Sequence, residues 1–388
     1  MKKICFCTTV SMTMKLFVVD TAKYLYEKCG YDITLICSGD KEFEKSLPPY
    51  IKFIPIDMVR GIDFSAPKVI KKLISVFKQN SFDMVQYSTP NAAFCAAVAA
   101  KIAKVPVRLY CQWGIRYVGL SGFARFLLKR IEKIVCRFST DIRAVSFMNR
   151  DFAVKEHLFK ADKVKVLGKG GTIGVDFNEF DISKAPQFRE EIRKEYYIDK
   201  EDFVFGFSGR LTRDKGTIEL LTAFERIAKK RENVKLLIVG PADNDKEEIK
   251  NLVNRVKETG KVIFAGRVDY SSIKKFYSAM DVLVHPTYRE GFGMVIQEAG
   301  ALGIPTITTR IPGASEVMEE GKSCFLVEPK NSDELEKMME YALSNKEEVI
   351  RIGQAARERT EKYFNRPVML ETLKNDYQNL LGMTNSND

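Results

Sequence analysis

A short polar loop at residues 208–217, with the sequence SGRLTRDKGT, has the composition of a phosphate-binding site. Arg210 and Lys215 supply two positive charges, and Gly209 lets the backbone approach a ligand closely. An amphipathic helix is expected to begin at the end of this loop, and a helix N-terminus favours anions. The loop predicts recognition of a phosphate or diphosphate, although it lacks the GK[ST] of a P-loop. The alternative is a solvated turn with incidental charge.

A second loop, at residues 286–298, combines carboxylates with a glycine-rich turn. Glu290 and Glu298 stand eight residues apart, and between them lie Gly291, Phe292, Gly293 and Met294, where a helix is expected to begin. Backbone N–H groups at a helix start attract anions, whereas carboxylates repel them. Carboxylates suit this place if they accept hydrogen bonds from neutral hydroxyls, as on a sugar or a ribose. The alternative is an acidic loop and a glutamate on an ordinary helix face.

The elements that must position these loops follow an α/β pattern. Strand-like runs such as FVFGFS, VKLLIVG and DVLVHP alternate with helical stretches along the whole chain. Nearly continuous apolar runs are typical of parallel strands that are buried on both faces. A change of character near residues 176–200 predicts two Rossmann-like domains with doubly wound sheets, which suits 388 residues. Ligands bind such sheets beyond the carboxyl ends of the strands, where both loops stand.

The positive charge of the chain is concentrated in its first half. The net charge is +11, and residues 1–180 carry +13 against −2 for residues 181–388. Residues 101–150 alone contain 11 basic and 2 acidic residues. A helix expected at residues 121–138 has one apolar face (Phe123, Leu127, Ile131, Ile134, Val135 and Phe138) and one basic face (Arg125, Lys129, Arg130, Lys133 and Arg137).

This basic excess suits an anionic membrane surface or a lipid-diphosphate acceptor. The alternative is a packed helix with a solvated basic face. Nucleic acid is not expected as a partner, because basic and aromatic residues do not interleave as in known binding modules.

Cysteine usage and hydropathy predict a cytoplasmic protein that can also lie at the inner face of the membrane. The eight cysteines stand mostly in apolar runs and include no CxxC pair, as in buried thiols of a reducing compartment. Polar residues interrupt the N-terminal run MKKICFCTTV, so no signal peptide is expected. The longest apolar stretch, residues 92–100, is too short to span a membrane.

Taken together, the motifs resemble those of family 4 glycosyltransferases, which are retaining, nucleotide-sugar-dependent enzymes of the GT-B fold. GRLTRDKG resembles the GR-x4-KG segment of that family, and EGFGMVIQE resembles its E-x7-E motif. The resemblance covers nearly all of residues 200–365, and the first half matches only in its general pattern. It implies two Rossmann-like domains facing across a cleft, an acceptor domain at 1–178 with helix 366–388 packed back on it, and a donor domain at 179–365.

The resemblance also implies roles for individual residues. Arg210 and Lys215 would clamp the donor diphosphate and, with Glu290, form the catalytic set, while Glu298 would bind the ribose hydroxyls. The remaining donor contacts would come from Gly209, Arg267, Val268, Gly291, Phe292, Gly293 and Met294. Neither a cofactor nor a metal is expected, because Arg, Lys and helix dipoles neutralise the diphosphate. The DxD at Asp243–Asp245 is interpreted as an ordinary polar loop.

The acceptor would contact loops of the first half, where Ser11, Gln112, Trp113 and Arg116 are the candidates. Trp113 could stack on a sugar, although a core position is the commoner role of a tryptophan. The expected reaction moves a hexose or N-acetylhexosamine from a nucleotide sugar, UDP-linked in preference to GDP- or ADP-linked, to a lipid-linked or polysaccharide glycan in capsule or lipopolysaccharide assembly. A small soluble acceptor, a GT-B-fold nucleotide-sugar epimerase and a non-catalytic binding module are the alternatives.

Overall fold

The computed structural model describes residues 1–388 except 60, 62–64, 243–246 and 383–388. The chain forms two compact units, of which unit 1 comprises 1–173 with 367–388 and unit 2 comprises 174–366. The first unit thus ends at residue 173, where the sequence predicted an end at 178. Asp243–Asp245 lies outside the described residues. No helix among the described ranges is long and apolar enough to cross a membrane.

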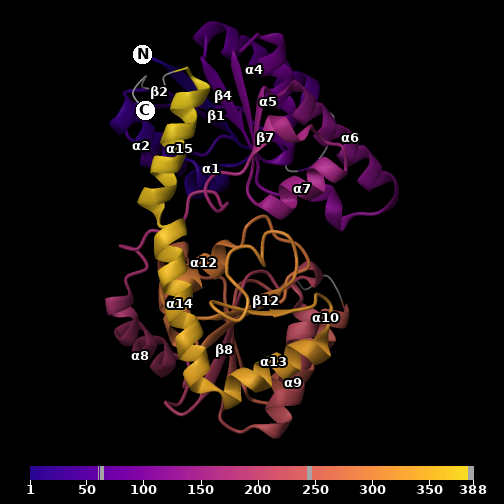
Figure 1. The fold of residues 1–388 in the computed structure, drawn as a ribbon, viewed down its shortest axis with the longest axis vertical. Coiled ribbons are helices and arrows are strands. Elements are labelled where there is room, and N and C mark those ends of the chain that lie inside the picture. Colours follow the sequence, from indigo (N-terminus) through magenta and orange to yellow (C-terminus); the bar gives the residue numbers. More distant parts are fainter. Residues whose placement is uncertain (60, 62–64, 243–246, 383–388) are drawn as a thin grey trace. The chain divides into compact units, whose positions relative to one another are not determined.

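Unit 1 is built on a seven-stranded parallel sheet with the order β3-β2-β1-β4-β5-β6-β7 (Figure 1). The strands are β1 (Lys3–Cys7), β2 (Asp32–Cys37), β3 (Ile51–Pro55), β4 (Met84–Tyr87), β5 (Val107–Gln112), β6 (Asp141–Ala144) and β7 (Val164–Lys165). The helices are α1 (Ser11–Phe17), α2 (Val19–Cys29), α3 (Lys41–Ser46), α4 (Ala66–Asn80), α5 (Pro90–Ile102), α6 (Gly122–Phe138), α7 (Phe147–Lys155) and α15 (Arg366–Leu380). The short 3-10 turn η1 (Arg116–Gly119) precedes α6.

The C-terminal helix α15 belongs to unit 1 from Pro367 onward, so the end of the chain returns to the first sheet (Figure 1). Arg143 on β6 makes a two-pronged ion pair with Asp376 at 2.7 and 2.8 Å, and both side chains are less than a tenth exposed. Tyr377 donates a hydrogen bond to Gln86 on β4. Polar contacts that are buried this deeply fix the register of α15 on the sheet.

Unit 2 is built on a six-stranded parallel sheet with the order β10-β9-β8-β11-β12-β13. The strands are β8 (Phe203–Ser208), β9 (Val234–Val239), β10 (Val262–Gly266), β11 (Val282–His285), β12 (Thr306–Thr309) and β13 (Phe325–Val327). The helices are α8 (Ala185–Glu195), α9 (Thr217–Lys230), α10 (Glu247–Glu258), α11 (Ile273–Ala279), α12 (Met294–Ala301), α13 (Ser332–Ser344) and α14 (Lys346–Phe364), with 3-10 turns η4 (Arg213–Lys215) and η5 (Tyr270–Ser272).

The sequences of the central strands of unit 2 explain why they lie at the centre. Every residue of β8 and of β11 is buried, as the continuous apolar runs predict for parallel strands covered on both faces. A β-carbon at Gly206 would lie 1.9 Å from the sulfur of Met280, so glycine on β8 leaves the space that the Met280 side chain fills. These two neighbouring strands carry the loop predicted to bind phosphate and the acidic loop at their carboxyl ends.

Helix α6 buries only part of its predicted apolar face. Phe123 and Ile134, which the periodicity placed on the apolar face, are 77% and 36% exposed. Val135 and Phe138 of that face do pack on the core of unit 1, and Leu128, which was not assigned to the face, packs there as well. Spacing alone identifies which side chains share a face of a helix, and it does not show which of them the rest of the unit covers.

Candidate functional site

The loop after β8, which the sequence predicted to bind phosphate, lies close to the loop after β11 because a glycine stands at the point of contact. Gly216 has φ +70°, and a β-carbon there would lie 1.9 Å from the carbonyl oxygen of Pro286. Gly209, with φ +149°, donates its N–H to Val239, and a β-carbon at Gly240 would lie 2.0 Å from the carbonyl of Gly209. The close approach of these backbones brings Lys215, at the end of η4, to the acidic loop.

Lys215, Glu290 and His285 meet at one carboxylate oxygen. Lys215 Nζ lies 2.7 Å from Glu290 Oε2, and His285 Nε2 lies 3.1 Å from the same oxygen. The other oxygen, Oε1, accepts the N–H of Gly291 at 3.2 Å. His285 ends the buried strand β11 and is 1% exposed, so its ring is fixed by the sheet. The carboxylate is therefore held in place from three sides.

These neighbours set the charge of the site. Burial alone would raise the pKa of Glu290, but the hydrogen bond from His285 and the charge of Lys215 outweigh it and hold that pKa well below its usual range. Burial lowers the pKa of His285, although Glu290 opposes this change. The neutral imidazole donates through Nε2 and leaves Nδ1 as an acceptor that has no partner among the described residues.

Glu298 lies in a different environment on helix α12. Tyr270 donates to its Oε1 at 2.9 Å and Tyr277 to its Oε2 at 3.0 Å, and Tyr277 also lies 3.1 Å from Ser208 Oγ at the end of β8. Glu298 is 4% exposed. Burial raises the pKa of this carboxyl to about 7, against the two phenol hydrogen bonds, which favour the ionised form. Two glutamates eight residues apart thus have opposite pKa shifts.

The glycine-rich turn between the two glutamates differs from the expectation that its N–H groups face a ligand. The N–H of Gly291 bonds to Glu290, and the N–H of Gly293 bonds to the carbonyl of Gly313 at 3.3 Å. Phe292 is 5% exposed and its ring contacts Phe364, with centroids 5.5 Å apart. Two of the expected donor contacts therefore already have partners inside the chain, and Phe292 belongs to the core.

The remaining predicted donor residues lie at the surface of unit 2. Arg210 follows β8, is exposed, and makes no ion pair within the described part of the chain. Arg267 is exposed directly after β10. Val268 is half-buried and packs on the apolar cluster that contains Tyr277, while Met294 begins α12 half-buried. The guanidinium of Arg210 is thus available to a ligand at the carboxyl end of β8.

Sequence reasoning missed Tyr270, Tyr277 and Asp214. Asp214 accepts hydrogen bonds from Thr212 at 2.6 Å and Arg289 at 3.1 Å, and so ties the two loops together. The tyrosines lie 28 and 21 residues from Glu298 along the chain, on η5 and α11. No spacing signal links residues so far apart. Strand β11 lies between the tyrosines and Glu298 in the sequence, and this order predicts only that all three lie near the same edge of the sheet.

The four acceptor candidates of unit 1 are not brought together as one set of free side chains. Ser11 Oγ donates to Asp40 at 2.6 Å, and Gln112 is fully buried with its Nε2 2.6 Å from Glu132. Arg116 is exposed on η1. Trp113 is half-buried and its ring lies 5.2 Å from that of Phe17.

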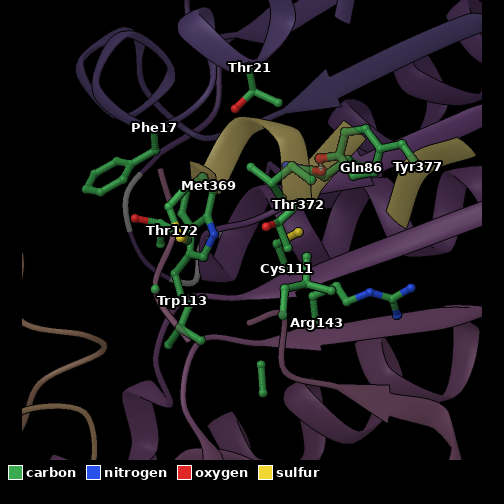
Figure 2. A pocket seen from close by; sticks show the side chains of 15 residues that line it. Phe17, Thr21, Gln86, Cys111, Trp113, Arg143, Thr172, Met369, Thr372 and Tyr377 are labelled. Atoms are coloured by element: carbon green, nitrogen blue, oxygen red, sulfur yellow. Dashed lines mark hydrogen bonds between the residues drawn. The ribbon is translucent and has the colours of Figure 1, made fainter. Parts of the chain in front are cut away.

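Figure 2 shows Trp113 among the side chains that line a small cavity, together with residues of α1, β4–β6 and α15. The cavity measures about 40 Å³, whereas pockets for small molecules measure about 300–1,000 Å³. It therefore has room for water and not for a sugar ring. This setting favours the core role of Trp113 that the sequence left open.

No group of three or more His, Cys, Asp or Glu side chains among the described residues is arranged to hold a metal ion. The cysteines are free, and all except the half-buried Cys29 are buried.

Comparison with known proteins gives the same family in both halves of the chain. The family model "Glycosyl transferases group 1" matches residues 188–359, and "Glycosyl transferase 4-like" matches residues 3–146. A capsular polysaccharide biosynthesis glycosyltransferase, CapM of Staphylococcus aureus, is 31% identical over an alignment 388 residues long, and this alignment covers 98% of each chain.

Among solved structures, HepE of Anabaena in complex with UDP and glucose has a TM-score of 0.81 at 21% identity and covers 98% of this chain and 100% of its own. WaaG, a glycosyltransferase involved in lipopolysaccharide biosynthesis, has a TM-score of 0.72 at 15% identity and covers 97% and 99%. At these identities the two structures establish the fold. The chain belongs to the group 1 glycosyltransferases and has the GT-B fold.

Proposed function

We propose that this glycosyltransferase is a retaining enzyme that moves a hexose or N-acetylhexosamine from a UDP-sugar to a lipid-linked or polysaccharide glycan. Capsule or lipopolysaccharide-type assembly is the proposed setting, at the inner face of the cell membrane. The names of CapM and WaaG support the setting, and the complex of HepE with UDP and glucose supports the donor. The metal-independent chemistry that we propose follows from the cations and helix N-termini at the carboxyl ends of β8 and β11.

The observation that carries the proposal is the cluster of Lys215, Glu290 and His285. A carboxylate kept ionised inside a protein is an acceptor for neutral hydroxyls, and a transferred sugar presents several of them. Lys215 contacts Glu290 directly, so the diphosphate and the sugar of one donor would meet at adjacent side chains. Arg210 adds a second cation at the end of β8.

Lys215 and Arg210 then act most strongly in the transition state. As the bond between sugar and diphosphate breaks, negative charge grows on the leaving oxygen and positive charge on the sugar. Fixed cations stabilise the leaving group, and the ionised Glu290 stabilises the sugar. In the front-face displacement that we propose, the leaving diphosphate oxygen accepts the proton of the acceptor hydroxyl, so no protein base has to stand on the acceptor side.

Glu298 is proposed to accept hydrogen bonds from the ribose hydroxyls of the donor. Its oxygens now accept the hydroxyls of Tyr270 and Tyr277, which shows that the carboxylate can hold two O–H donors at once. Tyr270 is 41% exposed, so it can give way to a ribose, whereas Tyr277 is fully buried.

The test is a panel of UDP-, GDP- and ADP-sugars incubated either with a lipid-diphosphate-linked sugar or with a small soluble sugar, read by nucleotide release and by analysis of the glycan product. We expect UDP release together with an extended glycan whose new anomeric linkage has the configuration of the donor. Transfer only to a small soluble sugar would favour the first alternative. An epimerised UDP-sugar without transfer would establish the epimerase and overturn the proposal.

A further inference from the structure

Helix α6 carries an exposed stripe that joins aromatic and basic residues. Phe123 is 77% exposed and Phe126 is 55% exposed. Arg130, Lys133 and Arg137 continue from them at spacings of three and four, which places all five on one side of the helix. We call these five residues the α6 stripe. Its first two residues are aromatic and its last three are cationic.

The cations of the α6 stripe differ from the other basic residues of the helix. Arg125 and Lys129 both pair with Glu156, at 3.6 and 2.7 Å, on another side of α6. Arg130, Lys133 and Arg137 make no ion pair within the described ranges of the chain. The guanidinium of Arg130 lies 5.1 Å from the centre of the Phe126 ring. The positive charge of the stripe is therefore not neutralised inside the protein, and it adjoins exposed aromatic surface.

The apolar part extends beyond the helix itself. Val118 on η1 and Leu120, which follows it, are 41% and 39% exposed and directly precede α6. Four large apolar side chains thus stand in water within one short segment, Val118–Phe126. Exposing them costs free energy, which burial in an apolar phase would recover.

We propose that the α6 stripe docks on an anionic phospholipid bilayer, with Phe123 and Phe126 inserted at the headgroup boundary and Arg130, Lys133 and Arg137 over the lipid phosphates. The charge of the segment supports this partner, since residues 101–150 have 11 basic against 2 acidic residues. Aromatic residues and a row of unpaired cations on one helix side suit the interface between acyl chains and anionic headgroups. This inference stands independently of the proposed reaction.

The test is co-sedimentation of the full chain with vesicles of phosphatidylglycerol and phosphatidylcholine, compared with phosphatidylcholine alone. We expect binding to the anionic vesicles that falls as salt is added. Each cation near such a surface strengthens binding about fivefold, so Arg130→Gln/Lys133→Gln/Arg137→Gln should weaken it about 100-fold. The matched control, Lys68→Gln/Lys71→Gln/Lys72→Gln on α4, removes the same charge from exposed positions elsewhere in unit 1 and should change binding far less.

The aromatic half is tested by Phe123→Ser/Phe126→Ser, which should weaken binding at least tenfold. Its control is Tyr197→Ser/Ile350→Ser, because Tyr197 and Ile350 are 90% and 60% exposed in unit 2. In addition, brominated lipids should quench the fluorescence of the tryptophan introduced by Phe126→Trp, and they should not quench that of the tryptophan introduced by Ile350→Trp. None of these variants touches the donor site, so UDP release without vesicles should stay unchanged.

Equal vesicle binding by the stripe variants and their controls would overturn the proposal. So would an absence of vesicle binding by the unaltered chain, or a dimer in sedimentation velocity that Phe123→Ser/Phe126→Ser dissociates, since the stripe would then contact a second copy. Vesicle binding without UDP release would contradict the proposed reaction and leave the membrane surface in place.

Discussion

The buried carboxyl of Glu298 makes the stability of unit 2 depend on pH in a direction that can be measured. Its pKa rises from 4.5 to about 7 because folding removes it from water. The folded state therefore binds this proton more tightly than the unfolded state. As a result, the free energy of unfolding decreases as the pH rises from 4.5 to 7. Ionising Glu298 in the folded chain costs about 3 kcal/mol, since one pKa unit corresponds to about 1.4 kcal/mol.

Glu298→Gln removes this cost, because glutamine keeps the shape of the protonated acid and carries no charge. Relative to the unaltered chain, the variant should gain about 2–3 kcal/mol of unfolding free energy between pH 5 and pH 8. For a unit of this size, that corresponds to roughly 5–10 °C in melting temperature. The assay is scanning calorimetry without nucleotide at both pH values.

Glu290→Gln supplies a control of opposite sign. Its folded-state pKa lies below the ordinary value, so ionised Glu290 contributes stability that is present above pH 4.5 and lost as the pH falls. Glu290→Gln should therefore destabilise unit 2 at pH 8. The reasoning about Glu298 would be refuted if Glu298→Gln differed from the unaltered chain by the same unfolding free energy at pH 5 and at pH 8. It would also be refuted if the variant were less stable than the unaltered chain at pH 8.

Three further substitutions test the site and the fold. Lys215→Ala should lower kcat about 10²–10³-fold in a UDP-release assay, as for loss of one oxyanion-stabilising group, and normal turnover would remove its proposed role. Gly216→Ala should destabilise unit 2 more than Gly260→Ala does. Both glycines have positive φ, but only at Gly216 would a β-carbon lie 1.9 Å from a backbone carbonyl oxygen. Equal melting temperatures of the two variants would contradict this. Arg143→Ala should cost about 3–5 kcal/mol in urea unfolding by leaving Asp376 buried without its partner, and a loss below 1 kcal/mol would show that the pair is dispensable.

The strand positions of unit 2 were predictable because each central strand is a short apolar run that ends at a polar or glycine-containing loop. FVFGFS and DVLVHP both appear as buried strands, and the loops after them meet as the rule for parallel sheets predicts. Lys215 and Glu290 could therefore be selected from sequence, since both follow neighbouring strands.

The side-chain partners could not be predicted in the same way. Tyr270 and Tyr277 reach Glu298 from η5 and α11, and only packing decides which phenols meet a carboxyl. Gln112 was interpreted as an acceptor contact, but Glu132 on α6 holds it inside unit 1. Phe123 was placed on the apolar face of its helix, and the sequence left open whether that face packs in the core or docks on a membrane. Helical periodicity identifies an apolar face and does not show which of its side chains the rest of the unit covers.

The most direct test of the central claim is glycan transfer measured beside UDP release. The unaltered chain and the variants Glu290→Gln and Lys215→Ala are each incubated with a UDP-sugar and a lipid-diphosphate-linked sugar. The proposed mechanism predicts UDP and an extended glycan in equal amounts, with retained configuration at the new linkage, and a loss of both products in the two variants. UDP released without glycan, an inverted linkage, or full transfer by both variants would contradict it.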